Sequence, residues 1–436
     1  MFERGSADEI RQWRGSLASL PRPADTAATI DRITELEKLK SAACAEQARL
    51  SAELEAMTRQ ERAEAGVRKE KQTAGVAAQV ALARRESPHK GGRLLGLAKA
   101  LTNEMPHTLA ALQAGVLNEW RATLVVRETA CLTLEDRQTV DREIGGDLKR
   151  LATMGDHRLV AAVKQLAYRL DAESVARRSR KAESERAVTI RPAPDTMTYV
   201  TALLPVAQGV GVYAALKRAA DSARNEGDPR NRGQVMADTL VECVTGSPAR
   251  QPVPVDLSLV MTDRSLLSGD DEPALLLGYG TIPADTARQL VAAAADAGLA
   301  WLRRLYTSPR AGDLIAMDSR ARRFPAGLGR LITVRDGGRC RTPWCDAPIR
   351  HLDHPVRHAD GGDTSALNGQ GLCEACNQAK EALGWRARPR PGPRHTVETT
   401  TPTGHRYRSQ APPLPGASRP GLTRLELYLT DLVLAV

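Results

Sequence analysis

Apolar residues recur at helical spacing through the first part of the chain. Between Ala28 and Ala83 the sequence contains no proline, and its apolar positions lie three, four or seven residues apart. This period predicts helix. The seven-residue spacing also suits a coiled coil, either as a homodimer with a second copy of the chain or folded back on the following segment. The positions that carry the pattern are Ile30, Ile33, Leu36, Leu39, Ala43, Leu50, Leu54 and Met57.

A second helical region follows a short break. The stretch SPHKGG (Ser87–Gly92) interrupts the pattern, because proline and paired glycines disfavour a continuing helix. Helical spacing returns from about Leu94 to Ser184, with turns expected near Asn103–Pro106 and Gly145–Gly146.

Beyond Ser184 short apolar runs alternate with helical stretches. We expect strands in TMTYVTALLP, VPVDLSLVMTD and ALLLGYG, and helices in RGQVMADTLVECV and PADTARQLVAAAADA. WLRRLYTSPRAGDLIAMD resembles a hairpin, and LTRLELYLTDLVLAV resembles a short apolar helix. The longest uncharged run, Tyr199 to Leu216, is interrupted by a proline and two glycines. It therefore predicts a strand and a buried helix rather than a membrane span.

Composition adds a local excess of positive charge. The 436 residues are too many for one compact core, so two or three domains are expected. The net charge is +10, and the stretch from Trp301 to Gln410 alone holds 19 Arg or Lys against 10 Asp or Glu, an excess of nine. All but one of these cations are arginines, whose planar guanidinium suits phosphate. The excess favours a footprint for nucleic acid over a merely soluble surface.

The N-terminus and the cysteines indicate a reducing compartment. MFERGSADEI is charged and lacks the apolar region of a signal peptide, so we expect a cytoplasmic protein with no membrane segment. In the cytoplasm paired cysteines bind metal more often than they form disulfides.

Four of the seven cysteines form two closely spaced pairs. Cys340 and Cys345 are five residues apart, and Cys373 and Cys376 are three apart. Two such pairs can surround one Zn²⁺ tetrahedrally, and thiolates are ligands that favour zinc. Four thiolates leave no open position on the metal, so we expect this zinc to be structural.

The segment between the cysteine pairs is rich in polar side chains that could support chemistry. HLDHPVRHADGG contains Asp353 and His354, and Asn368 and Asn377 follow. The order predicted is strand, turn, loop and helix. Adjacent residues of a strand point to opposite faces, so Asp353 and His354 need a local twist to serve one site.

At this point the chain resembles two known families. RDGGRCRTPWCDAP and LDHPVRHADGGDTSALNGQGLCEACNQAK are similar to the HNH endonuclease domain, in which a two-stranded hairpin and a helix grip a divalent cation. The resemblance covers about Arg335 to Trp385. TLAALQAGVLNEWRA and DSRARRFPAGLGRLI resemble the helical domain of unknown function 222, found ahead of such nuclease domains in actinobacterial proteins.

The resemblance implies roles for individual residues. His354 matches the general base that activates water, and Asp353 matches the acidic metal ligand. Asn368 matches the asparagine that fixes the loop. Asn377 stands where the last histidine is usual, making an H-N-N variant whose amide oxygen suits Mg²⁺ or Mn²⁺. The residues expected to contact DNA are Arg339, Arg341, Arg357, His358 and Lys380.

The sequence thus predicts a mainly α protein with α+β parts, and the resemblance implies a C-terminal ββα-metal domain. The resemblance implies a metal-dependent DNA endonuclease that hydrolyses phosphodiester bonds. Two alternatives are a zinc-stabilised DNA-binding protein without cleavage activity and a self-associating structural protein with a vestigial nuclease. The predicted domains are a coiled-coil-like segment (1–92), a helical domain (93–250), a mixed connector (251–330), the nuclease domain (331–410), and a tail with a short helix (411–436).

Overall fold

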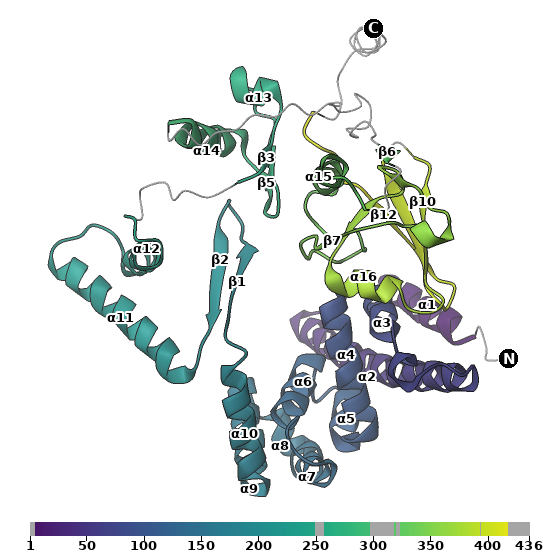
Figure 1. The fold of residues 1–436 in the computed structure, drawn as a ribbon. Helices are drawn as coiled ribbons and strands as arrows, with labels where there is room; N and C mark the ends of the chain where they lie inside the picture. Colours follow the sequence, from purple (N-terminus) through teal and green to yellow (C-terminus); the bar gives the residue numbers. More distant parts are fainter. Residues whose placement is uncertain (1–4, 249–256, 297–317, 320–322, 393, 417–436) are drawn as a thin grey trace. The chain divides into compact units, whose positions relative to one another are not determined.

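The computed structural model describes residues 5–248, 257–296, 318–319, 323–392 and 394–416. The chain divides into two units. The first contains residues 1–57 and 94–177, and the second contains residues 58–93 and 178–436. The first unit is helical, and the second combines small sheets with helices (Figure 1).

The first unit is built from α1 (Gly5–Ala18), most of α2 (Thr26–Glu64) and α4 (Pro88–Asn103), α5 (Pro106–Gln113), α6 (Glu119–Glu128), α7 (Leu134–Val140), the π-helical turn η2 (Asp141–Gly145), α8 (Leu148–Ala152), α9 (Asp156–Leu170) and the first half of α10 (Ala172–Glu183).

Amphipathic helices form the core of this unit. In α9, Leu159, Val163 and Leu166 recur at helical spacing and are all buried. Each buried side chain of this size contributes about 1.5–3 kcal/mol. The buried carboxylate of Asp141 accepts hydrogen bonds from the backbone N–H groups of His107 and Thr108, both at 2.8 Å. These are unpaired donors in the first turn of α5, so a buried acid caps a helix begun by proline.

The long N-terminal helix folds back on the segment that follows it. Ala45 and Ala48 of α2 pack against Leu97 and Leu101 of α4. By contrast, Ile30, Ile33, Leu36, Leu39, Leu50 and Met57 are exposed. Self-association through these exposed residues stays a prediction.

The predicted helix from Ala28 to Ala83 is not continuous. α2 ends at Glu64, and α3 (Val76–Arg84) begins after the 3-10 turn η1 (Lys69–Lys71). Gly66 and Gly75 adopt φ of +73° and +80°, a left-handed conformation that a helix excludes. The buried guanidinium of Arg62 stabilises the connection, donating to the carbonyl groups of Lys71, Gln72 and Ala74. The break expected at Ser87–Gly92 is shorter than predicted, because α4 already begins at Pro88.

The second unit contains α3, α11 (Val206–Asn225), α12 (Arg232–Thr245), α13 (Asp263–Leu267), α14 (Ala284–Asp296), α15 (Ala326–Arg335), α16 (Glu374–Lys380) and the 3-10 turn η3 (His358–Asp360). Its strands are β1 (Ala187–Pro192), β2 (Thr198–Leu203), β3 (Leu259–Val260), β4 (Ala274–Leu276), β5 (Gly280–Ile282), β6 (Asp318–Ser319), β7 (His351–Asp353), β8 (Thr364–Ser365), β9 (Gln370–Leu372), β10 (Arg386–Arg390), β11 (Thr396–Thr400) and β12 (Arg406–Gln410).

All pairings among the described strands are antiparallel. Two sheets have three strands, in the orders β3-β4-β5 and β10-β11-β12. Three further sheets pair β1 with β2, β6 with β8, and β7 with β9. The β1–β2 ribbon is visible in Figure 1, and its β1 strand, AVTIRP, is absent from the sequence-based prediction.

Several predictions for the second half can be compared with these elements. The expected strand and helix in Tyr199–Leu216 correspond to β2 and α11. The predicted burial of that helix is wrong, because Val206, Val210 and Tyr213 are exposed and only Ala220 of α11 is buried. None of the described helices is long and apolar enough to cross a membrane. The expected hairpin at 301–318, apart from its last residue, and the apolar helix at 422–436 lie outside the described residues.

Candidate functional site

A short hairpin followed by a helix forms the framework of the site. β7 pairs with β9 in the register His351↔Leu372, Leu352↔Gly371 and Asp353↔Gln370, and α16 follows β9 directly. β7 and α16 are labelled in Figure 1. Gly371 is required by close packing, because a Cβ there would lie 2.2 Å from Cδ1 of Ile349. The segment HLDHPVRHADGG therefore begins on a strand that faces the helix carrying Asn377 and Lys380.

The four predicted zinc ligands meet at the base of this helix. Cys340, Cys345, Cys373 and Cys376 are all buried, and their sulfur atoms lie within 4.8 Å of one another. The Sγ atoms of Cys345 and Cys373 are 3.7 Å apart. Zinc–sulfur bonds of about 2.3 Å in a tetrahedron place neighbouring sulfurs about 3.8 Å apart. The cluster thus has the dimensions of a four-thiolate zinc site.

The electrostatics of the cluster also suit a cation. Hydrogen bonds from Cys345 and Cys376 lower the pKa of Cys340. Hydrogen bonding to Cys340, together with burial, raises the pKa of Cys345 and of Cys376. Without a cation the group therefore holds fewer than four thiolates, because each buried negative charge opposes the next. A divalent metal such as Zn²⁺ would allow all four to ionise.

Asp353 lies in a fully paired polar environment. Lys380 Nζ donates to both of its carboxylate oxygens, at 2.7 and 2.8 Å, and Gln370 Nε2 donates to Oδ2 at 2.8 Å. Lys380 also donates to the backbone carbonyl of His354 at 2.6 Å. The Lys380 and Asp353 side chains are only 8% and 11% exposed, so this is a nearly buried ion pair. It fixes the end of β7 against α16.

His354 is held on two sides. Its ring stacks on Phe324 with centroids 4.3 Å apart, and its Nε2 lies 3.0 Å from the Thr364 hydroxyl. No described residue hydrogen-bonds Nδ1. Burial lowers the pKa of His354, and the charge of Asp353 opposes this only in part. The imidazole is therefore mostly neutral near pH 7.

Asn368 closes the loop after His354. The buried carboxamide of Asn368 accepts from Val356 N–H at 2.9 Å and donates to the Val356 and Asp363 carbonyls, at 2.9 and 2.8 Å. Gly362 passes so close that a Cβ there would lie 2.0 Å from the Val356 oxygen. Asn368 thus ties the Val356 backbone, two residues after His354, to Asp363 on the other side of the loop.

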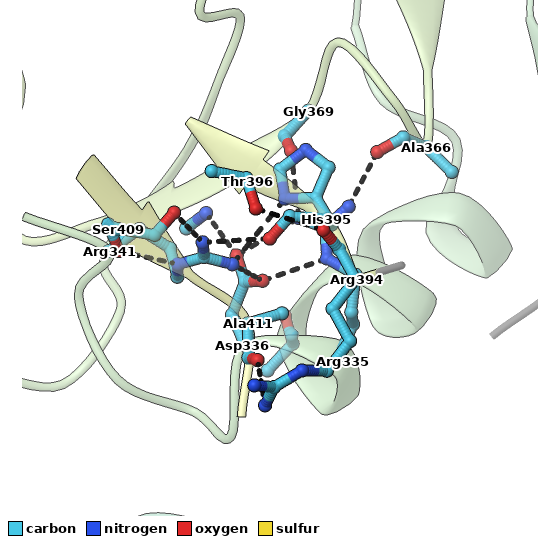
Figure 2. A network of polar contacts seen from close by, with 12 residues as sticks. Arg335, Asp336, Arg341, Ala366, Gly369, Arg394, His395, Thr396, Ser409 and Ala411 are labelled. Carbon is cyan, nitrogen blue, oxygen red and sulfur yellow. Dashed lines mark hydrogen bonds and ion pairs between the residues drawn. The ribbon is translucent and has the colours of Figure 1, made fainter. Parts of the chain in front are cut away.

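A buried network in turn holds the loop that carries Asn368 (Figure 2). Asp336 accepts from the guanidinium groups of Arg335 and Arg341, at 2.8 and 2.9 Å, and from Gly371 N–H at 2.8 Å. Arg335 also donates to the carbonyl groups of Ala366 and Gly369, on either side of Asn368.

His395, the residue before β11, also belongs to this network. Its Nε2 lies 2.9 Å from the Leu367 carbonyl, which can only accept, so Nε2 carries the proton. Nδ1 then faces Arg341 Nη1 at 3.4 Å. Burial lowers the pKa of His395 to about 4. The ring is therefore neutral at pH 7 and anchors the loop as a hydrogen-bond donor.

The residues expected to bind DNA lie in different environments and do not form one surface. Arg357 is half-buried and forms an ion pair with Glu381 at 3.3 Å, and the exposed His358 lies edge-on to His354. Arg339 donates to the Asp346 and Gly278 carbonyls. Arg341 and Lys380 are buried in ion pairs, so their cations do not face solvent.

Asn377 is half-buried on α16, one turn before Lys380 and therefore on the same side of the helix. Sequence reasoning misses the roles of Arg335, Asp336 and His395. No sequence motif around these residues indicates their roles. An arginine in a basic segment, for example, suggests a surface position. The position of Lys380, four residues after Cys376, would have placed it on the face of the helix that packs inward.

Comparison with known proteins gives one family. Residues 34–336, which are 303 of the 436, match the domain of unknown function (DUF222). The matched range ends at Asp336, before the cysteine cluster and the His354 loop. No curated protein and no solved structure matches the chain. Because the matched range covers well over half of the sequence, the chain belongs to the DUF222 family.

Proposed function

We propose that the chain is a metal-dependent DNA endonuclease of the HNH type, in the H-N-N variant, with its site on the β7–β9 hairpin and α16. The observation that carries the proposal is the environment of His354. A largely neutral imidazole is fixed by Phe324 and Thr364, next to Asp353, with Nδ1 unengaged by the described residues. This is the state that a general base needs near neutral pH.

The chain's own residues divide the work. His354 Nδ1 would accept the proton of the attacking water, while the Thr364 contact at Nε2 keeps the ring from rotating. Asn368 holds the backbone at Val356 and so keeps the loop after His354 in place. The zinc-type cysteine cluster joins the hairpin to the helix, since Cys340 and Cys345 precede β7 and Cys373 caps α16.

Asp353 and Asn377 are the residues that would hold the catalytic cation. A carboxylate and an amide oxygen on facing elements are donors that Mg²⁺ and Mn²⁺ accept. The bound cation would neutralise negative charge on the phosphate and on the leaving oxygen. Lys380 now occupies both oxygens of Asp353, so its ammonium has to turn away before Asp353 can bind a metal.

That ion pair favours a second candidate function. A carboxylate neutralised by a nearly buried ammonium has no electrostatic need for a divalent cation. The same fold would then bind DNA without cutting it. The unengaged Nδ1 of His354 favours the nuclease, because a binding module does not require a neutral, oriented imidazole.

Incubation of supercoiled plasmid with the zinc-loaded protein separates these functions. The nuclease predicts nicked or linear DNA with Mg²⁺ or Mn²⁺ and intact plasmid when neither ion is added. Retarded but intact plasmid under all three conditions would favour the binding module. Intact plasmid without retardation would contradict both.

A further inference from the structure

The three-stranded sheet β10-β11-β12 carries an arginine-rich face. The register aligns Arg386 with Thr400 and Arg406, and it aligns Arg388 with Glu398 and Arg408. Side chains two residues apart on a strand share a face. The arginines that therefore share one face are Arg386, Arg388, Arg390, Arg406 and Arg408.

This face points to solvent. The opposite face buries Ala387 and Val397, and its Tyr407 packs edge-on against Trp344, next to Cys345. Arg341 also reaches that opposite face through Ser409. The arginine face is therefore turned away from the cysteine cluster, and all five of its arginines are exposed.

The charge on this face is largely uncompensated. Glu398 is the only acidic residue in the three strands, and it pairs with Arg390 and Arg408. Hydrogen bonds from these two arginines lower the pKa of Glu398 to about 2, so it stays ionised at neutral pH. Five arginines and one glutamate leave a net charge of +4. No acidic residue that the structure describes pairs with Arg386, Arg388 or Arg406.

We propose that this arginine face binds the sugar–phosphate backbone of duplex DNA, as a contact surface separate from the His354 site. Arginines two positions apart lie about 6.6 Å from each other along a strand, and each guanidinium can grip a phosphate through two hydrogen bonds. A surface evolved for solubility alone mixes both signs of charge. The inference rests on the proposed function in taking DNA as the partner.

The contact is independent of sequence, because phosphates carry no base information. It strengthens DNA binding without entering the reaction. Loss of the arginines should therefore raise the DNA concentration needed for cleavage and leave the rate at saturating DNA nearly unchanged.

The test measures binding of full-length, zinc-loaded protein to short fluorescein-labelled duplexes by anisotropy, without Mg²⁺ or Mn²⁺, across a range of salt concentrations. The variant replaces Arg386, Arg388 and Arg406 with Gln. Each phosphate that the variant no longer neutralises makes the slope of log affinity against log salt shallower by about 0.9, so up to about 2.7 is expected for three. Affinity should fall at least roughly tenfold at moderate salt, equally for two unrelated sequences.

Two comparisons make the result specific. A charge-matched control replaces Arg14, Arg150 and Arg158, which are exposed on the helical first unit, with Gln and should change neither slope nor affinity. Glu398→Gln releases two arginines and should tighten binding. An unchanged slope in the sheet variant overturns the proposal, as does selective loss of binding to phosphatidylglycerol vesicles with DNA binding intact. Absence of plasmid cleavage with Mn²⁺ would count against the nuclease alone and leave the binding result standing.

Discussion

Asp336 is the centre of the network that holds the Asn368 loop, and its replacement by Asn should loosen that loop strongly. Asp336 is fully buried between Arg335 and Arg341, whose side chains are only 4% and 3% exposed. Asp336→Asn keeps the shape but removes the charge. Two buried guanidiniums then lack their counter-ion, and Gly371 N–H loses a carboxylate acceptor.

The expected cost follows from this burial. Removing one partner of a buried ion pair destabilises a protein by about 3–5 kcal/mol. At about 1.4 kcal/mol for each factor of ten, the equilibrium for opening the loop should rise by roughly two to nearly four powers of ten. This is a large part of the 5–15 kcal/mol that stabilises a typical domain.

Amide hydrogen exchange followed by mass spectrometry measures this opening where it occurs. Peptides that contain Gly371 should lose protection in Asp336→Asn, whereas peptides from α9 in the first unit should exchange as in the wild type. Asp346→Asn is the matched control, since Asp346 is an exposed aspartate in the same region. Equal exchange at Gly371 in the two variants would show that the charge of Asp336 does not hold the loop closed.

Three further predictions concern neighbouring groups. The pKa of His395 is lowered to about 4 in the fold, so its contribution to stability is intact above about pH 6.5 and about 3 kcal/mol is lost as the pH falls from 6.5 to 4. His395→Gln should therefore make the thermal unfolding temperature less dependent on pH over this range. An equal pH dependence in the variant and the wild type would contradict this prediction. Lys380→Met frees Asp353, so Mn²⁺ should activate cleavage by the variant at a concentration at least tenfold lower than in the wild type. Loss of activity in a folded variant at every Mn²⁺ concentration would show instead that the ammonium is required. Cys373→Ser should remove about one zinc per chain and unfold the hairpin and α16, and elemental analysis that finds no zinc in the folded, reduced wild type would refute the zinc assignment.

Short sequence patterns predict the elements that are stabilised by residues close together in the chain. α12 is expected at 232–244 and spans Arg232–Thr245, because an amphipathic stretch follows the Asn231–Gln234 capping box. The cysteine spacing predicts the cluster, since two short-range pairs need only one long-range contact to meet. The break after Glu64 escapes prediction because isolated glycines are tolerated in helices, and only the contacts of Arg62 show where the chain turns.

The polar contacts of the candidate site depend on residues that are far apart in the chain. Asp353 and Lys380 are 27 residues apart, and Arg341 and His395 are 54 apart. Without knowledge of a buried partner, an arginine or lysine is expected at the surface. The sequence alone therefore predicts Arg341 and Lys380 at a DNA interface. The arginine face of β10–β12 depends on strand pairing in the same way. Its charges can be counted in the sequence, but only the strand register places them on one face.

The proposed role of His354 as the general base of a nuclease is tested most directly by comparing plasmid cleavage by His354→Ala and His351→Ala. Both histidines lie in the segment HLDHPVRHADGG, but His351 is exposed at the start of β7, whereas His354 follows the strand and is held by Phe324 and Thr364. With Mn²⁺ and saturating DNA, His354→Ala should lower the rate by roughly 10²-fold or more, with zinc content and DNA binding unchanged. His351→Ala should cleave within a few-fold of the wild type. A fully active His354→Ala protein would show that His354 is not the general base.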